Sequence, residues 1–379
     1  MPQIPLSEGE LRHAVEVVEK VGGSKTKAAK ILGIDRRRVG ERLEMAARRG
    51  IAPGHFENGV APGYQMGKVT VQRGPNGSVE RTWERQSPDA ERTLELLKAA
   101  AQAIMEGIPA RKKVRTPAQV EIDLLTQYTF TDYHMNMLAW DKEGGANWNI
   151  EIAEETAMRA MKYLTDGAPR SNTAVVVIQG DWQHYDSMMP MTPTSGHVVD
   201  MAGRPQQGIA ASIRVIVALV DMALQKHENV ILEMCEGNHD IYTSMVLRQM
   251  FAFYYRNEPR VTVPDGQIPF YAIQWGQTAL FFHHGHMKKW KDLPLTFAAM
   301  FPKIWGDTTK RYGNTGHYHH EKREEHSGIK MIQHPTMAAN DSHGSRHGYM
   351  SQREMTAITF HKEFGRGSEI VVTPEMVGM

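Results

Sequence analysis

The stretch Asn229-Val-Ile-Leu-Glu-Met-Cys-Glu-Gly-Asn-His-Asp240 shows how the central part of this chain is built. Its first seven residues, Asn229–Cys235, form the short apolar run that is typical of a buried strand. A glycine follows, and then Asn238, His239 and Asp240 place an amide, an imidazole and a carboxylate just after the strand. A strand end holds such groups rigidly and leaves them open to a substrate. The stretch therefore predicts a site of metal or acid–base chemistry.

Four further motifs of this kind occur, and each is expected where a strand gives way to a loop. They are Asp132-Tyr-His134, Gly180-Asp181-Trp-Gln-His184, His283-His284-Gly285-His286 and Gly316-His317-Tyr-His319. Carboxylates, imidazoles and amide oxygens suit manganese, iron or zinc. A carboxylate in a Gly-Asp turn can bridge two cations, and a pair about 3.5–4 Å apart can hold both oxygens of a phosphoryl displacement. Ten of the 18 histidines fall between His283 and His347, which also indicates metal or proton chemistry.

Apolar runs alternate with helices from about residue 116 onward. The predicted strands are Val120–Thr129, Ala174–Ile178, Asn229–Cys235, Thr278–Phe282 and Met355–Phe360, and the predicted helices lie near 150–165, 206–226 and 241–256. Such alternation predicts a layered α/β or α+β domain, which we assign to residues 116–379.

Together the five motifs resemble the signature of the calcineurin-like metallophosphoesterases over roughly residues 120–360, with the blocks Asp-x-His, Gly-Asp, Gly-Asn-His-Asp, His-Gly and Gly-His-x-His in family order. The resemblance implies an α/β phosphoesterase sandwich that binds two divalent metal ions. Manganese is the expected metal, with iron, zinc or nickel as alternatives.

The resemblance also implies the metal ligands. The first metal would be held by Asp132, His134, Asp181 and His319. Asp181 would bridge to a second metal, which is completed by Asn238, His284 and His317. His283, His284 and His286 all have a suitable side chain, but the family pattern places the ligand directly before glycine and so favours His284. His286 would then face the substrate.

The catalytic roles follow from the same resemblance. His239 matches the family's catalytic histidine, which stabilises charge on the phosphate or protonates the leaving oxygen, and Asp240 would orient its ring. His184, three residues after Asp181, resembles the branch that contains the double-strand-break-repair nucleases, where this histidine faces the scissile phosphate. No Gly-Asp-x-Val-Asp-Arg-Gly string occurs, which argues against a protein phosphatase. The residues beyond the core do not resemble the capping domain of the repair nucleases.

The first 50 residues form a separate prediction. Capping residues Ser7, Ser24 and Asp35 each precede a predicted helix, and residues 25–43 resemble a bacterial helix-turn-helix. Segment 24–49 carries nine Lys or Arg and three Asp or Glu, so its charge is +6 and the remainder of the +1 chain is −5. A local basic patch is typical of a polyanion partner. The expected DNA-binding residues are Arg36, Arg37, Arg38, Arg42, Lys25 and Lys27. The alternative is a helical adaptor whose arginines only face solvent.

Residues 51–115 are predicted to form a linker that contains a hairpin and a helix. The hairpin strands are Lys68–Arg73 and Ser78–Arg85, on either side of Gly74-Pro75-Asn76-Gly77. An Ala- and Leu-rich helix is expected from Ser87 to about Gly107.

The composition limits the class of protein. The single cysteine, Cys235, excludes a disulfide framework and a Cys-rich zinc module. The N-terminus lacks the pattern of a signal peptide, and no window approaches about 18 uninterrupted apolar residues. We therefore expect a cytoplasmic protein without a membrane partner.

Three functions remain compatible with the sequence. The favoured one is a DNA phosphodiesterase, a nuclease or nickase that the helix-turn-helix brings to DNA. The second is a phosphoesterase acting on nucleotides or cyclic nucleotides, in which the N-terminal module mediates homo-oligomer or protein contacts. The third is a DNA-binding regulator with a degenerate catalytic domain, and the presence of every expected ligand argues against it.

Overall fold

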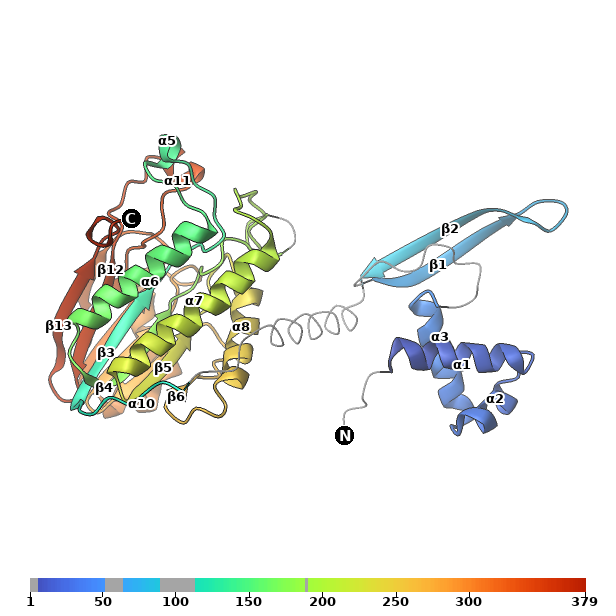
Figure 1. Cartoon of the computed structure of the whole chain (residues 1–379), viewed down its shortest axis with the longest axis horizontal. Coiled ribbons are helices and arrows are strands. Elements are labelled where there is room, and N and C mark those ends of the chain that lie inside the picture. The colour runs from blue at the N-terminus through green and yellow to red at the C-terminus, as the bar shows by residue number, and fades with distance from the viewer. Residues whose placement is uncertain (1–5, 52–63, 89–112, 188–189) are drawn as a thin grey trace. The chain divides into compact units, whose positions relative to one another are not determined.

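A computed structural model describes residues 6–51, 64–88, 113–187 and 190–379. The chain divides into two compact units, Met1–Ala110 and Arg111–Met379, which are considered separately (Figure 1). The Ala- and Leu-rich helix predicted from Ser87 to Gly107 lies almost entirely outside the described residues.

The first unit begins with three short helices, α1 (Glu8–Lys20), α2 (Lys25–Leu32) and α3 (Arg36–Arg48). Their N-caps are the predicted Ser7, Ser24 and Asp35, whose side chains accept hydrogen bonds from backbone amides of the first turn. The helix α2 ends at Gly33, whose φ of 65° is a left-handed conformation that glycine adopts without strain. The three predicted helices are therefore confirmed, together with their caps.

A small apolar core joins these helices, because their buried faces meet. It contains Val17, Val18, Ala28 and Val39, with Leu11, Val15 and Ala46 in a second cluster. The predicted hairpin follows as β1 (Tyr64–Arg73) and β2 (Val79–Pro88), which pair antiparallel. Both strands are longer than predicted.

The second unit contains a six-stranded sheet. Its strands are β3 (Glu121–Phe130), β4 (Ser171–Ile178), β5 (Asn229–Met234), β6 (Val261–Thr262), β12 (Met355–His361) and β13 (Gly365–Val372). They lie in the order β13-β12-β3-β4-β5-β6, and β3 to β6 are parallel. The carboxyl ends of β3, β4 and β5 therefore reach the same edge of the sheet.

A five-stranded sheet packs against the first. Its strands are β7 (Tyr271–Trp275), β8 (Thr278–Phe282), β9 (Lys310–Thr315), β10 (Lys322–His326) and β11 (Ile329–Gln333), in the order β10-β11-β9-β8-β7. The strands β8, β9 and β11 are parallel. The inner faces of the two sheets share one apolar core, to which Leu125 and Val177 contribute from the larger sheet and Leu280, Phe282 and Ile332 from the smaller one.

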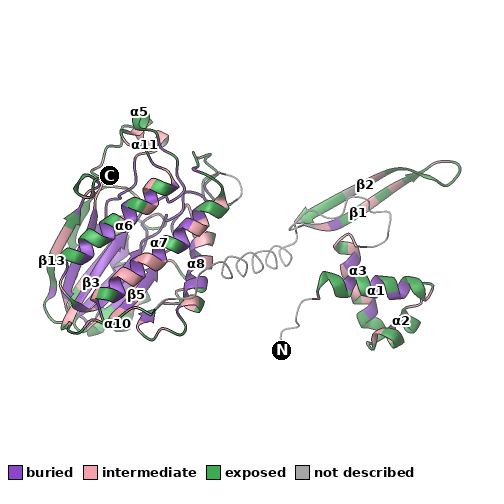
Figure 2. Ribbon diagram, viewed as in Figure 1, coloured by how far each residue is buried: buried purple, intermediate pink, exposed green. Residues whose placement is uncertain are grey.

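Helices cover the outer faces of both sheets, and Figures 1 and 2 show those on the larger sheet. The larger sheet carries α6 (Ile150–Gly167) and α7 (Pro205–Lys226). The smaller sheet carries α9 (Leu293–Met300) and α10 (Pro302–Asp307), which pack on Phe281 and Met331. The remaining helices are α8 (Ile241–Tyr254) and the short α5 (Asp141–Gly144) and α11 (Ser342–Arg346). This layered arrangement confirms the mixed α/β fold expected from the sequence.

By length and composition alone, α7 is apolar enough to cross a membrane. In the fold it packs on β4 and β5, and more than half of its apolar window is buried. A helix that covers a central sheet needs this apolar character for its packing.

Candidate metal centre

All five sequence motifs lie just after strand ends. Asp132 and His134 follow β3, Asp181 and His184 follow β4, and the Gly-Asn-His-Asp segment follows β5. The histidine motifs follow β8 and β9 of the smaller sheet. Hydrogen bonds connect the two sets of loops, because His284 Nδ1 donates to Gln179 O at 2.9 Å and His317 N donates to Asp132 Oδ2 at 2.8 Å. The edges of both sheets thus form one site.

The backbone of these loops is strained in an informative way. Among the described residues, five non-glycine residues have a positive φ, and all five are predicted ligands: Asp132, His134, Asp181, His317 and His319. Their φ values lie between 47° and 72°. A left-handed conformation is unfavourable for side chains with a Cβ and persists where the surrounding structure enforces it, often at functional sites.

Glycines permit the loops to approach one another closely. A Cβ at Gly237 would collide with the Asp181 carboxylate and backbone, and a Cβ at Gly316 would collide with Thr131 and Asp132. Gly180 has a φ of 94° and lies against the ring of His284. The glycines of the motifs are therefore required because the ligand loops pack directly on them.

Two clusters gather the predicted ligands. Asp132, His134 and His319 form one, and Asp181, His284 and His317 form the other; in each, the ligand atoms lie within 4.8 Å of one another. The clusters adjoin, since His284 Nε2 lies 3.0 Å from Asp181 Oδ2 and 3.7 Å from Asp132 Oδ1. The first cluster contains three of the four residues expected for the first metal, without Asp181, and the second contains three of the four expected for the second metal, without Asn238. That each binds a metal ion remains a prediction.

The chemistry of the cluster fits divalent cations. The side chains of Asp132 and Asp181 are almost fully buried, and within the described part of the chain their only cationic neighbours are histidines. Among the described residues, Asp132 Oδ1 and Asn238 Oδ1 are buried without a hydrogen-bond partner. Buried charges need a counter-charge and buried polar atoms need a partner, and a bound cation supplies both.

The carboxylates and imidazoles perturb one another strongly. Burial alone would raise the pKa of Asp132 and Asp181, but the neighbouring imidazoles, with His284 the strongest, together override this effect and lower both. For His284, burial opposes protonation, yet Asp181 and Asp132 raise its pKa to about 10. A proton on the His284 ring thus partly offsets the buried negative charge of Asp181 and Asp132. A bound cation would have to displace this proton.

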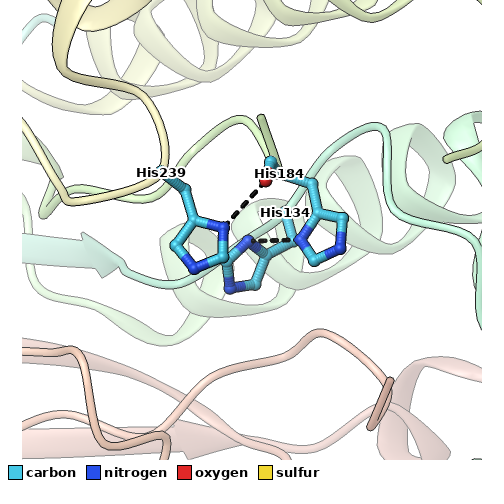
Figure 3. A group of neighbouring side chains, drawn as sticks. All are labelled: His134, His184 and His239. Atoms are coloured by element: carbon cyan, nitrogen blue, oxygen red, sulfur yellow. Dashed lines mark hydrogen bonds between the residues drawn. The ribbon is translucent and has the colours of Figure 1, made fainter. Parts of the chain in front are cut away.

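His134, His184 and His239 form a third cluster beside the first (Figure 3). His184 Nδ1 lies 3.1 Å from His134 Nδ1, within hydrogen-bonding distance. If His134 presents Nε2 to a cation, its proton is on Nδ1 and is donated to His184. Burial lowers the pKa of His184 to about 3, which keeps its ring neutral and able to accept. In the structure His184 therefore contacts a predicted ligand.

His239 is oriented by a backbone carbonyl. Its Nδ1 donates to His184 O at 2.8 Å (Figure 3). This leaves Nε2 able to donate or accept a proton. Its side chain is 19% exposed, whereas the side chain of Asp181, 4.0 Å away, is 2% exposed. His239 N also donates to Asp181 Oδ1 at 2.8 Å, which fixes the loop.

Asp240 has a different role from the one expected. Its carboxylate accepts hydrogen bonds from the backbone amides of Asp181, Trp182, Gln183 and Gly237, at 2.8–3.2 Å. The expectation that it orients the His239 ring is corrected, because the His184 carbonyl does so. Burial, with the neighbouring Asp181 carboxylate, raises the pKa of Asp240 to about 7, and the backbone donors oppose this by favouring the carboxylate. Asp240 thus holds the loops after β4 and β5 together.

The structure also places His286, His283 and Cys235, which the sequence analysis singled out. His286 is half-buried, and its ring lies 5.4 Å from that of His284 and 6.2 Å from that of His317. His283 is fully buried and stacks on Phe270, with ring centroids 4.6 Å apart. Cys235 is buried in the core between the sheets.

Supporting residues that the sequence did not single out lie beside the motifs. Thr131 Oγ1 donates to Asp132 Oδ2 at 2.6 Å, and Asn136 Oδ1 accepts from His184 N at 2.8 Å. Gln179 O accepts from His284. Their proximity to the motifs in the sequence was the only available signal. Thr131 contacts its own neighbour, whereas Asn136 and Gln179 act on segments 48 and 105 residues away.

The basic residues of the first unit lie on α2 and α3. Arg36, Arg37 and Arg38 are exposed in the first turn of α3, and Arg42 is half-buried one turn later. Arg37 pairs with Glu41 at 2.8 Å and Arg38 with Asp35 at 3.6 Å, so acidic neighbours partly offset both charges. Lys25 and Lys27 are exposed on α2. A role of these residues in DNA binding remains a prediction.

Comparisons with known proteins add limited information. No family model matches the sequence, and no curated protein matches it. The chain is similar to solved structures of a predicted phosphoesterase from Streptococcus pneumoniae (11% identity, TM-score 0.31) and of an archaeal phosphodiesterase (14%, 0.34). It is also similar to vacuolar protein sorting 29 from Cryptosporidium parvum (11%, 0.31). The matches cover 67%, 65% and 66% of this chain and 92%, 99% and 95% of those chains. Similarities at this level do not decide the family or the activity.

Proposed function

We propose that this chain is a metal-dependent phosphodiesterase that hydrolyses phosphodiester bonds in DNA. The observation that carries the proposal is the pair of adjoining Asp/His clusters, with His239 beside them at the end of β5. Two buried carboxylates balanced only by imidazoles, within the described residues, form an arrangement suited to two divalent cations.

The cations would be held by the two ligand sets, with Asp181 shared and Asn238 completing the second. Manganese is the proposed metal, with iron, zinc or nickel as alternatives. Bound divalent cations would supply the Lewis acidity that makes water nucleophilic near neutral pH and that neutralises charge on a phosphate. The two metals would correspond to the two clusters that contain an aspartate.

The histidines beside the metal ligands would transfer the proton and contact the substrate. His239 presents Nε2 while the His184 carbonyl fixes its ring, so it is placed to protonate a leaving oxygen or to stabilise phosphate charge. His184 positions both His134 and His239. His286, half-buried beside His284 and His317, is proposed to face the substrate.

The first unit supports DNA as the substrate. The start of α3 exposes three successive arginines in a segment of charge +6, and such a patch suits the phosphates of DNA. A unit that binds DNA would raise the local concentration of substrate for a catalytic unit on the same chain.

The test is hydrolysis of three substrates by the full-length chain with Mn²⁺: supercoiled plasmid, linear DNA and bis-p-nitrophenyl phosphate. We expect cleavage of all three and loss of all activity after treatment with EDTA. Dye release without DNA cleavage would overturn the DNA substrate and favour a small-molecule phosphoesterase, in which the first unit serves oligomer or protein contacts. Inactivity on all three with metal bound would overturn the phosphodiesterase.

A further inference from the structure

We propose that Tyr318, together with Lys288 and Lys289, binds an unpaired nucleotide next to the scissile phosphate, so that the metal centre prefers single-stranded over duplex DNA. The inference rests on the proposed function and adds to it the form of the DNA at the metal centre. It concerns an exposed strip on the two loops that follow β8 and β9.

Tyr318 is held at the edge of the centre by its neighbours in the sequence. It lies between the predicted ligands His317 and His319, whose positive φ values fix the local backbone. Consecutive Cα atoms are about 3.8 Å apart, so the tyrosine stands next to both clusters. It is nevertheless 57% exposed, while the Asp132 side chain beside this loop is buried.

The ring of Tyr318 is oriented while much of its surface stays open. It packs edge-on against the His317 ring, with centroids 4.8 Å apart and planes inclined by 66°. An edge-on contact with His317 covers at most one face of the tyrosine ring, so a flat partner can stack on the other face. A nucleobase is such a partner, and stacking of this kind needs a base that is not paired within a duplex.

Two lysines lie in the loop that follows β8. Lys288 and Lys289 come just after His286, whose ring lies 6.2 Å from that of His317. Both are exposed, and neither forms an ion pair with any residue that the structure describes. Lys288 lies close enough to His283 to act on it electrostatically. These charges are available to phosphates on either side of a stacked base.

Trp290 holds this lysine loop against the loop that carries Tyr318. Lys322 Nζ lies 4.7 Å from the centre of its ring, and its Nε1 donates to Glu324 at 2.9 Å. Lys322 and Glu324 begin β10, just after the Tyr318 loop. The aromatic ring and the cations are thus on adjacent, connected loops, which is the combination that single-strand binding requires.

The experiment compares Tyr318→Ala and Tyr318→Phe with the wild type in the full-length chain with Mn²⁺. A single-stranded oligonucleotide, a blunt duplex and bis-p-nitrophenyl phosphate serve as substrates. We expect Tyr318→Ala to raise KM for the single strand about 5- to 100-fold, the loss typical of one stacked base, with a much smaller effect on the activated ester. Tyr318→Phe, which keeps the ring, should behave as the wild type. Tyr163→Ala, a tyrosine substitution on α6, is the matched control.

Lysine variants test the electrostatic part. Lys288→Ala and Lys289→Ala should each lower the slope of log KM against log salt for the single strand by about one or less. Equal losses on the ester and the oligonucleotide in Tyr318→Ala, or no loss on either, would overturn the nucleotide contact. Preferred cleavage of the duplex by the wild type would also overturn it. Failure of the wild type to cleave any DNA would instead overturn the proposed function, and this inference with it.

Discussion

The two units of this chain use charge in opposite ways. In the first unit the arginines of α3 are at the surface, and the side chain of Arg37 is 88% exposed. In the second unit Asp132 and Asp181 are buried among histidines. Surface charges interact weakly, are screened by salt and suit a polyanion that must be released. Buried charges are costly unless they are paired, and they suit a fixed metal site.

The two units also differ in how far apart the interacting residues lie in the sequence. The caps of α1 and α3 join residues three positions apart, such as Arg38 N with Asp35. In the metal centre His317 donates to Asp132, 185 residues earlier. Local contacts form a module that tolerates substitution at its surface, whereas the metal centre depends on the whole fold of its unit. The predictions below test this contrast.

The largest effect is expected from Asp181→Asn. Its carboxylate belongs to the second cluster and lies 3.0 Å from His284, so its loss should reduce activity on every substrate to background and lower the metal content. Metal analysis and hydrolysis of bis-p-nitrophenyl phosphate measure both. DNA binding by the first unit should be unchanged. The matched control is Asp123→Asn, which removes a half-buried carboxylate paired with Lys362 outside the metal centre. Normal activity and metal content in Asp181→Asn would contradict the dinuclear centre.

A smaller loss is expected from His239→Ala. This ring is more exposed than the carboxylates and belongs to neither proposed ligand set, so metal content should persist while kcat falls by about 10²- to 10⁴-fold, the usual contribution of a general acid or base. A sharp fall in bound metal would show that His239 is a ligand.

His184→Ala tests the support of His134. Loss of the contact between the two Nδ1 atoms should weaken metal affinity about 10- to 100-fold, the usual effect of removing a residue that orients a ligand. Activity should therefore recover at high Mn²⁺ concentration. If activity stays low at saturating metal, and lower for DNA than for the activated ester, His184 acts on the substrate instead.

Replacing Arg36, Arg37 and Arg38 with alanine should affect the first unit alone. Duplex DNA binding should weaken, and the slope of log Kd against log salt should fall by about one for each arginine that contacts a phosphate. Hydrolysis of bis-p-nitrophenyl phosphate should stay within about twofold of the wild type, as for independent units. Arg12→Ala, in an ion pair with Glu8 on α1, is the control. Equal losses on ester and DNA would mean that the first unit supports the fold of the second.

The smallest effect concerns acid stability. Burial lowers the pKa of His227 to about 4, and Tyr128 and Ser171 hydrogen-bond its ring. In the unfolded chain this histidine binds a proton at about pH 6.5. The contribution of neutral His227 to the free energy of unfolding is therefore complete above that pH and is lost as pH falls toward 4. The loss is at most about 3 kcal/mol. The free energy of unfolding of the second unit, measured with denaturant, should fall over this pH range, and His227→Gln should make that fall smaller.

Much of the second unit could be predicted from the sequence because its central strands are apolar and its helices are periodic. The strands β3, β4, β5, β8 and β12 and the helices α6, α7 and α8 are confirmed. The strands β6, β7, β9, β10, β11 and β13 were not predicted. For β9 and β10 the reason is that 310–315 and 322–326 are rich in charged and polar residues. They are strands because β8 and β11 pair with them. Pairing between distant segments leaves no local pattern in such a sequence.

The sequence by itself determined what is local: the caps of the three helices, the strand runs, and the order of the five motifs at strand ends. Only the tertiary structure decided how the polar groups are paired. Asp240 accepts the amides of residues 181–183, 57–59 positions away, and His184 contacts His134 and orients His239. The physical reason is that a side chain with several acceptors or donors takes the partners that the crossing loops bring to it, and a one-dimensional pattern does not specify which loops cross.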